Sequence, residues 1–299
     1  MATDLGVAWR RFRRNKSALA GLCIIGALVV AAVLAPLITS HDPVGVDTAA
    51  SRRPPSGAHW FGTDLLGRDV FTRVVYGARV SLRVGALSAA IAVVVGLVMG
   101  SLAGTYAGRF DAALMQATNV FLAFPYLLAA LVIITVVGRG EAAVILVIGL
   151  LGWMHIARVL RSSILQVRDS EYVQAARAAG CGQVRIIVGH LLPNALQPVI
   201  VLAALFVGTA ILSEAALSFL GVGITDPTPA WGLMLADGRR FVASSPHLLF
   251  FPGMAVFVTV LAFVLVGEGL RDALDPRSRP AGGERRPGWG ARGADQPIC

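Results

Sequence analysis

Charged residues are scarce in this sequence. Asp, Glu, Lys and Arg together make up 14% of the 299 residues, hydrophobic residues make up 56%, and the mean hydropathy is +0.72. A soluble domain needs more polar surface than this composition provides. The composition therefore excludes an ordinary soluble fold and predicts a membrane protein.

Lysine is almost absent, which excludes a nucleotide site built on a phosphate-binding loop. The one lysine, Lys16, follows Asn15, whereas such a loop needs Gly-Lys-Ser/Thr. Neither His-Glu-x-x-His nor Gly-x-Ser-x-Gly occurs. We therefore expect no catalytic residue and no bound cofactor in this chain, which is predicted not to be an enzyme.

Patterns for binding metals and nucleic acids are also missing. The cysteines fit neither a disulfide framework nor a metal site, and no two histidines form a ligand pair at helical spacing. We interpret the histidines as packing or interface residues. The formal charge of +9 comes without interleaved basic and aromatic residues, so no nucleic-acid partner is predicted. The residues considered are Cys23, Cys181, Cys299, His41, His59, His155, His190 and His247.

Long apolar runs, in contrast, are abundant. An α-helix needs about 20 apolar residues to cross the ~30 Å hydrocarbon layer of a bilayer. The sequence therefore predicts an all-α, polytopic membrane protein with six transmembrane helices and both termini on one side. The runs that meet or approach this length lie at about 17–38, 82–107, 112–137, 142–162, 195–217 and 249–269.

The basic residues indicate that the termini are cytoplasmic. The basic N-terminal flank is typical of a signal peptide, but Ser17–Ile38 exceeds the ~7–15-residue core of a cleaved signal. It is predicted to be an uncleaved membrane helix. Lys and Arg favour the side that carries the N-terminus, although six arginines between Arg52 and Arg83 run against this bias.

Two segments outside the spans have distinct compositions. In the first loop, Val70–Leu82 is predicted to form an amphipathic helix on the membrane surface. The tail after Leu274 is rich in Pro, Gly and Arg and is predicted to be disordered. The loop also contains residues typical of turns, namely Gly62, Asp64, Gly67 and Asp69.

Glycine recurs at every fourth position along the second span. The residues are Gly96, Gly100, Gly104 and Gly108. This spacing places all four on one face of a helix, so we expect another helix to approach that face closely.

Ionisable residues inside the spans are few. Glu214 and Glu268 are the exceptions, each near a predicted helix end. A proton- or sodium-coupled carrier usually needs buried charges near the bilayer midplane, and this pattern does not supply them. Glu214 is interpreted either as a solvated residue at the outer interface or as a polar contact that holds a gate.

A short polar segment between the fourth and fifth runs reads EYVQAARAAGCGQVRIIVGHLLPNAL, residues 171–196. Asp169 and Ser170 are good N-cap residues, and Glu171 would lie in the first helical turn, where the helix dipole favours an anion. The predicted helix ends at Gly180 and Gly182, and a second short helix follows at about 183–190. One smooth face is formed by Tyr172, Ala175, Ala176 and Ala179.

The small-residue face of this helix has two interpretations. A helix with small side chains fits deeply into a groove of another protein. A helix of this kind also lies on the bilayer surface in many membrane proteins. The residues alone leave both open.

The stretch QAARAAGCGQVRIIVGHLLP resembles the EAA loop of binding-protein-dependent ABC importer permeases. Gln174 stands where the family has Glu. Three further stretches, at 61–85, 214–232 and 267–279, look like the C-type permease of the dipeptide, oligopeptide and nickel importers, so the resemblance covers about 5–279. The positions that match the EAA loop are Gln174, Ala175, Ala176, Gly180, Leu192 and Pro193.

This resemblance implies a type I ABC importer permease fold in the bacterial plasma membrane. The implied partners are a homologous permease in a heterodimer, two cytoplasmic ABC ATPases that bind the ATP and Mg²⁺, an extracytoplasmic substrate-binding protein and membrane lipid. The implied function is ATP-driven import of di- or oligopeptides. Import of nickel or another small ligand is the alternative within the family, and a self-sufficient channel or secondary transporter is the alternative outside it.

The resemblance also assigns roles along the chain. The expected division is a cytoplasmic tail at 1–16, a first helix at 17–38, an extracytoplasmic loop at 39–81, a permease core at 82–272 with its coupling loop at 166–193, and a disordered cytoplasmic tail at 273–299. The residues expected to couple the chain to an ATPase are Glu171, Tyr172, Gln174, Ala175, Ala176, Arg177, Ala179, Gly180, Leu192 and Pro193.

Overall fold

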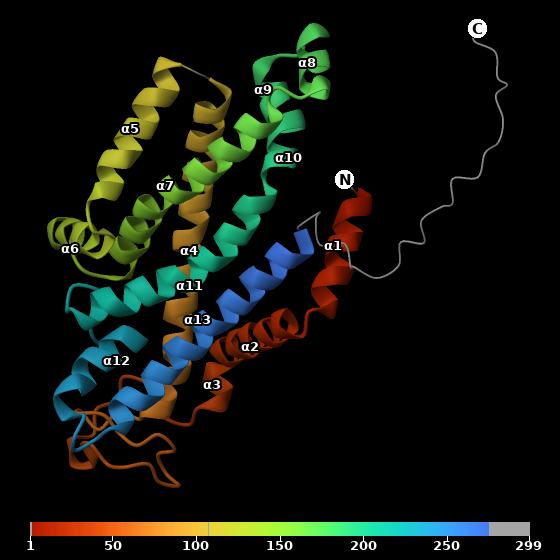
Figure 1. Cartoon of the computed structure of the whole chain (residues 1–299). Coiled ribbons are helices and arrows are strands. Elements are labelled where there is room, and N and C mark those ends of the chain that lie inside the picture. The colour runs from red at the N-terminus through yellow and green to blue at the C-terminus, as the bar shows by residue number, and fades with distance from the viewer. Residues whose placement is uncertain (1, 107, 275–299) are drawn as a thin grey trace, which may run out of the picture.

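The computed structural model describes residues 2–106 and 108–274, and this part of the chain is mostly helical. The predicted disordered tail from 275 onward and Cys299 lie outside the described residues. Figure 1 shows α8 and α9 at one end of the helix bundle and α12 at the other, below called the α8 end and the α12 end. The helices are α1 (Ala2–Arg14), α2 (Lys16–Val33), α3 (Ala35–Ile38), α4 (Val70–Thr105), α5 (Arg109–Ala123), α6 (Tyr126–Val137), α7 (Glu141–Val167), α8 (Glu171–Ala178), α9 (Gln183–Ile186), α10 (Leu192–Ala195), α11 (Gln197–Phe219), α12 (Trp231–Gly238) and α13 (His247–Leu274), with single turns at Thr48–Ala50, Ile187–Leu191 and Arg239–Phe241.

Five of the described helices, α2, α4, α7, α11 and α13, are long and apolar enough to cross a membrane. The pair formed by α5 and α6 supplies a sixth span if the two count as one. The prediction of an all-α, polytopic membrane protein is therefore confirmed, and the six predicted spans agree with the upper count of five or six. The side on which the termini lie stays a prediction.

The third span is not the continuous helix predicted at 112–137. The chain breaks between α5 and α6, whose axes differ by 89°. Pro125 lies at the break and has no N–H to donate to the carbonyl of Phe121. It also restricts the residue before it, and Phe124 is extended with φ −83° and ψ 137°. The average hydropathy of the run conceals this bend.

The predicted surface helix at Val70–Leu82 is also wrong, because these residues are the first part of the 36-residue helix α4. At 1.5 Å per residue α4 is roughly 54 Å long, which exceeds the bilayer core and leaves its first turns beyond the hydrocarbon. The two arginines of this segment are engaged within the chain. Arg73 is 1% exposed, and Arg79 donates hydrogen bonds to the carbonyls of Ala32 and Val33.

The glycine face of α4 lies against α7. A Cβ atom added at Gly96 would meet the side chain of Ile156 at 2.7 Å, and one at Gly104 would meet Ile164 at 2.8 Å. At Gly100 the nearest atom is the backbone oxygen of Ala157, at 2.7 Å. The two helices can approach this closely only because these positions carry no side chain.

Gly108 does not belong to this face, contrary to the expectation from its spacing. The helix α4 ends at Thr105, and Gly108 is the exposed N-cap of α5, with φ +97° and nothing within 4 Å of an added Cβ. A four-residue spacing places residues on one face only within a helix, and Gly108 lies beyond the end of α4.

Gly100→Leu is expected to destabilise the chain by about 1–3 kcal/mol, because the leucine would push the α7 backbone away and strain its own rotamers. Thermal unfolding of the purified chain in detergent measures this loss. Val98→Leu is the matched control, since Val98 is 53% exposed on the same helix. Equal unfolding temperatures for Gly100→Leu and Val98→Leu would show that the α4–α7 contact tolerates a large side chain.

Candidate functional site

The start of helix α8 is fixed by hydrogen bonds that involve the residues just before it. Ser170, with φ −70° and ψ 152°, is the N-cap, and its hydroxyl donates to the carbonyl of Val167 at 2.6 Å. The amide of Gln174 donates to the carbonyl of Asp169 at 2.9 Å. Glu171 in the first turn complements the positive end of the helix dipole. Gln174 thus closes the helix start with a hydrogen bond that its amide can donate and a glutamate carboxylate could not.

The end of α8 has the geometry of a Schellman motif. Gly180 adopts φ +77°, its N–H donates to the carbonyl of Arg177 at 3.0 Å, and the N–H of Cys181 donates to the carbonyl of Ala176 at 3.1 Å. Only glycine takes this left-handed conformation without a Cβ penalty. The chain therefore turns sharply at Gly180.

A single apolar side chain anchors α8 to the rest of the protein. Val173 is fully buried in a cluster with Ile164, Ile186 and Leu191. Val173 was not among the predicted site residues, and its only signal in the sequence is that it is a branched apolar residue in a mostly polar segment.

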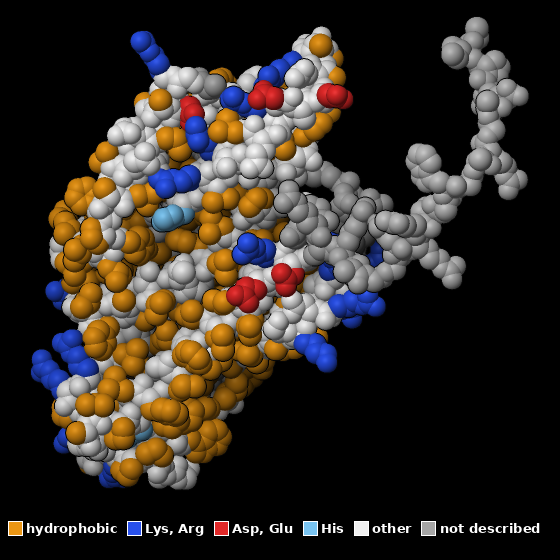
Figure 2. Space-filling view, viewed as in Figure 1, with side chains coloured by type: hydrophobic (Ala, Val, Ile, Leu, Met, Phe, Trp, Pro, Cys, Tyr) orange, Lys and Arg blue, Asp and Glu red, His pale blue; other side chains and the backbone are white. Residues whose placement is uncertain are grey.

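The predicted small-residue face points mostly to solvent. Tyr172, Ala175 and Ala179 are exposed, and Ala176 is half-buried. Figure 1 shows α8 projecting from its end of the bundle, and Figure 2 shows Asp, Glu and Arg side chains at that end beyond a broad band of hydrophobic ones. Within the described residues, most of this face is therefore left open to a partner outside the chain.

Pro193 shapes the connection from α8 to the long helix α11. Pro193 has no N–H to donate to the carbonyl of Gly189, and a π turn forms at Ile187–Leu191, closed by the N–H of Leu192 to the carbonyl of Ile187. Leu192 and Pro193 are half-buried. Single π turns occur frequently at functional sites. The connection is thus a chain of short helical pieces rather than one rigid helix.

Glu214 lies inside the bundle, and its interpretation as a solvated interface residue is wrong. It has no exposed surface. The hydroxyl of Ser81 on α4 donates to Oε2 at 3.3 Å, and the hydroxyl of Ser218 donates to Oε1 at 2.8 Å. Ser218 also accepts the N–H of Ile224 at 3.0 Å. Glu214 therefore links α11 to α4 and, through Ser218, to the loop that follows α11.

A buried cluster of charges holds together the α12 end. Asp64 accepts from Arg68 Nε at 2.6 Å, and Arg68 Nη1 donates to Asp226 at 2.9 Å. Arg73 lies 3.6 Å from Asp64 and 3.7 Å from Asp226, and its Nη1 donates to the carbonyl of Pro43 at 2.9 Å. The sequence predicts only a turn at Asp64, and the pairing of Arg68 with Asp226 leaves no local signal because the two residues are 158 positions apart.

The cluster also changes protonation behaviour. Burial raises the pKa of Asp237, and the nearby charge of Asp226 raises it further. Burial opposes the charge of Arg68, but the hydrogen bond and charge of Asp64 raise its pKa on balance. The arginine thus stays charged, while Asp237 protonates at a higher pH than an exposed aspartate does.

Comparison with known proteins identifies the family. Residues 96–280 match the family described as binding-protein-dependent transport system inner membrane component, and residues 4–55 match the N-terminal transmembrane domain of oligopeptide transport permease C. The chain belongs to this family of transport permeases. Membership makes it a multi-pass inner-membrane protein and implies ATPase and binding-protein partners in general.

The relatives of this permease cover almost its whole length. It is 42% identical to the dipeptide transport system permease protein DppC of Alkalihalophilus pseudofirmus, over 91% of this chain and 90% of that protein. It is 39% identical to the oligopeptide transport system permease protein OppC of Bacillus subtilis, over 91% of this chain and 89% of that protein.

A solved structure supports the same fold. An inward-facing conformation of the MetNI methionine ABC transporter superposes with a TM-score of 0.55 and 20% identity, over 67% of this chain and 96% of that chain. This likeness concerns the fold of the permease and not its substrate.

Proposed function

We propose that this permease is one transmembrane subunit of an ATP-driven peptide importer. It pairs with a homologous permease, with two cytoplasmic ATPases and with an extracytoplasmic binding protein that delivers di- or oligopeptides. The identity of about 40% to dipeptide and oligopeptide permeases over nine-tenths of the chain supports this substrate class. In this arrangement the α8 end faces the cytoplasm.

The observation that carries the proposal is the exposed face of α8. The helix is held by Val173 alone among its apolar residues, and the alanines at 175 and 179 face outward. Small side chains let the helix enter a groove deeply. The Schellman turn at Gly180 directs the following residues away from the exposed face, so they do not block this contact. We propose that this face of α8 docks into a groove on an ATPase.

Motion of α8 has a route to the interior of the bundle. The joint at Ile187–Leu191 and the half-buried Pro193 connect α8 to α11. Glu214 lies 17 residues after the first residue of α11, or roughly 25 Å along the helix. When ATP closes the two ATPases, a shift of α8 would pull on α11 and change the contact between Glu214 and Ser81. This is a two-state element biased by a remote ligand.

Reconstitution tests the proposed function. The chain is purified alone and together with its permease partner and two ATPases, and each preparation is placed in proteoliposomes with binding protein and dipeptides or Ni²⁺. We expect ATP hydrolysis and peptide uptake only from the full assembly. Uptake by the lone chain would establish a self-sufficient channel or secondary transporter, and uptake of Ni²⁺ but not peptide would establish the other substrate class.

Glu214→Gln is expected to leave the chain folded and to change the ratio of peptide transported to ATP hydrolysed. Glutamine keeps the shape and accepts the hydrogen bond of one serine, but its NH₂ group cannot accept the other. Uptake and ATPase rates in proteoliposomes measure the ratio. Ser213→Ala is the control, because Ser213 is the half-buried neighbour of Glu214 in the sequence, and its hydroxyl donates to the carbonyl of Thr209 and not to Glu214. If both rates of Glu214→Gln equal those of the wild type, the charge has no gating role.

A further inference from the structure

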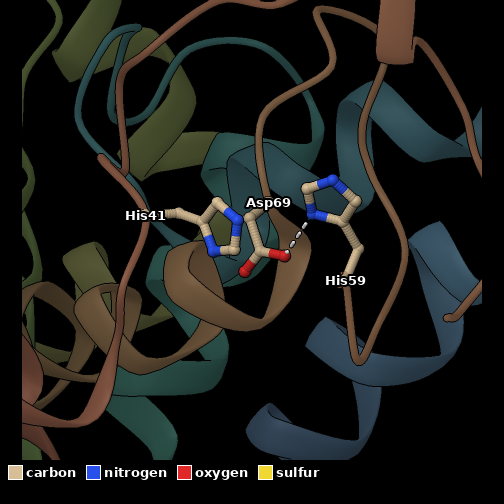
Figure 3. A group of neighbouring side chains, drawn as sticks. All are labelled: His41, His59 and Asp69. Carbon is tan, nitrogen blue, oxygen red and sulfur yellow. Dashed lines mark hydrogen bonds and ion pairs between the residues drawn. The ribbon is translucent and has the colours of Figure 1, made fainter. Parts of the chain in front are cut away.

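Three potential metal ligands meet at the α12 end, although they are far apart in the sequence. His41 follows α3, His59 lies in the loop before α4, and Asp69 is the N-cap of α4. Figure 3 shows the two imidazole rings on either side of the Asp69 carboxylate. One ligand atom from each residue lies within 4.8 Å of those of the other two. The ring centroids of His41 and His59 are 4.9 Å apart.

The carboxylate and one imidazole are already fixed in place. Asp69 accepts the N–H of Thr72 on Oδ1 at 2.8 Å, and its Oδ2 lies 3.0 Å from Nδ1 of His59. Asp69 is 4% exposed, so its direction is set by the fold. A tetrahedral zinc ion holds its nitrogen and oxygen ligands roughly 3.3 Å from one another. The separation of Asp69 and His59 therefore suits two ligands of one ion, with the metal replacing the proton between them.

The side chain of His41, the third proposed ligand, is free to rotate toward the other two. His41 is exposed, and its Nδ1 lies 3.3 Å from the hydroxyl of Ser40. A ligand histidine usually uses one nitrogen for the metal and the other for a supporting hydrogen bond, which here leaves Nε2 for the metal. The ligand atoms lie within 4.8 Å of one another, which is about 1.5 Å more than the distance between two ligands of one zinc ion. A rotation of the exposed His41 side chain can close this difference.

Two of the three ligands, His41 and Asp69, border a hollow that leaves room for a fourth ligand. The hollow has a volume of about 220 Å³, and His41, Asp69 and Thr72 line it together with Trp60 and Phe71. Thr72 is 1% exposed, and its hydroxyl has no hydrogen-bond partner among the described residues. A buried polar group of this kind is rare. Beside a metal it could bond to a water or ligand atom in the fourth coordination position.

We propose that His41, His59 and Asp69 bind one divalent transition-metal ion of the Zn²⁺ class. Two imidazole nitrogens and one carboxylate oxygen are ligands that Zn²⁺ accepts, whereas Ca²⁺ and Mg²⁺ prefer oxygen alone. The ion fastens the segment after α3 to the first turn of α4 and holds an open position toward the hollow.

Metal titration of the full-length chain tests this proposal. The chain is purified without a histidine tag, reconstituted in nanodiscs and titrated with Zn²⁺ by calorimetry, with Co²⁺ as a spectroscopic probe. We expect one Zn²⁺ per chain, visible absorption from bound Co²⁺ and a higher unfolding temperature with Zn²⁺. His41→Ala should weaken Zn²⁺ binding more than about tenfold, because loss of even a supporting group lowers metal affinity 10–100-fold.

Two further variants make the outcome decisive. His190→Ala removes an imidazole at the α8 end and should bind Zn²⁺ as the wild type does. Asp69→Asn retains an acceptor for the N–H of Thr72, so it preserves the helix cap while it removes the charged ligand. Absence of stoichiometric Zn²⁺ binding, or equal affinity in the wild type and His41→Ala, would overturn the proposal.

Discussion

Gly180→Glu is expected to abolish transport by the assembled importer while the chain still folds and inserts. The cost within the chain is small, because nothing lies within 4 Å of a Cβ at this position, although the φ of +77° disfavours any L side chain by about 1 kcal/mol. The larger effect arises outside the chain. The new anion lies at the negative end of the α8 dipole and beside the proposed ATPase groove. Uptake into proteoliposomes measures transport, and the yield of folded subunit measures folding and insertion.

Two matched variants separate the causes of this loss. Gly182→Glu adds the same side chain two residues later, where φ is −63° and the surroundings are also open, so it tests charge and bulk without backbone strain. Gly180→Asn keeps a residue that tolerates the left-handed conformation and should retain most transport. Normal uptake by Gly180→Glu would show that α8 serves as an interfacial helix and not as the coupling element.

Crosslinking locates the same contact directly. A cysteine at Ala175, which is exposed, should crosslink to a cysteine in the ATPase groove more readily in one nucleotide state than in another, with the half-buried Cys181 replaced by serine. Ala176 is the second position, although its half-buried side chain should react more slowly. Crosslinking that is absent in every nucleotide state would contradict the docking of α8.

The elements that the sequence predicts well are those with a local cause. Apolar runs of about 20 residues predict the spans, because each crosses the bilayer by itself. The end of α8 also has a local cause, because glycine at 180 takes φ +77° without the penalty that a Cβ atom would bring. The helix register of Gly96, Gly100 and Gly104 predicts a shared face, but it fails at Gly108, where the helix has already ended.

The elements that the sequence predicts poorly depend on distant residues. Arg68 looks like a charge that opposes the predicted orientation until Asp64 and Asp226 are seen beside it. His41 and His59 look unrelated until the loop folds back on the start of α4. The bend at Pro125 is a different failure, because its cause is local and visible, yet an average over the apolar run hides it.

Asp64→Ala is expected to have the largest effect on stability, a loss of about 3–5 kcal/mol, because it leaves buried arginine charge uncompensated. Arg68 and Arg73 are 4% and 1% exposed, and Asp64 is the nearer and more buried of the two aspartates that form ion pairs with both of them. Asp64 also accepts the backbone N–H groups of Leu66 and Arg68, each at 2.9 Å, so its loss opens the turn before α4.

The comparison with Asp226→Ala decides whether this buried charge is the cause. The side chain of Asp226 is 50% exposed. Water can therefore replace much of the ion pair that Arg68 loses in Asp226→Ala, and the loss of stability should be smaller. Asp64→Asn should lie between the two, since it retains an acceptor for the backbone and loses only the charge. Thermal unfolding of each purified chain in the same detergent gives the order. If Asp64→Ala unfolds no earlier than Asp226→Ala, the two arginines do not depend on Asp64, and the α12 end is held instead by apolar packing around the buried Trp231.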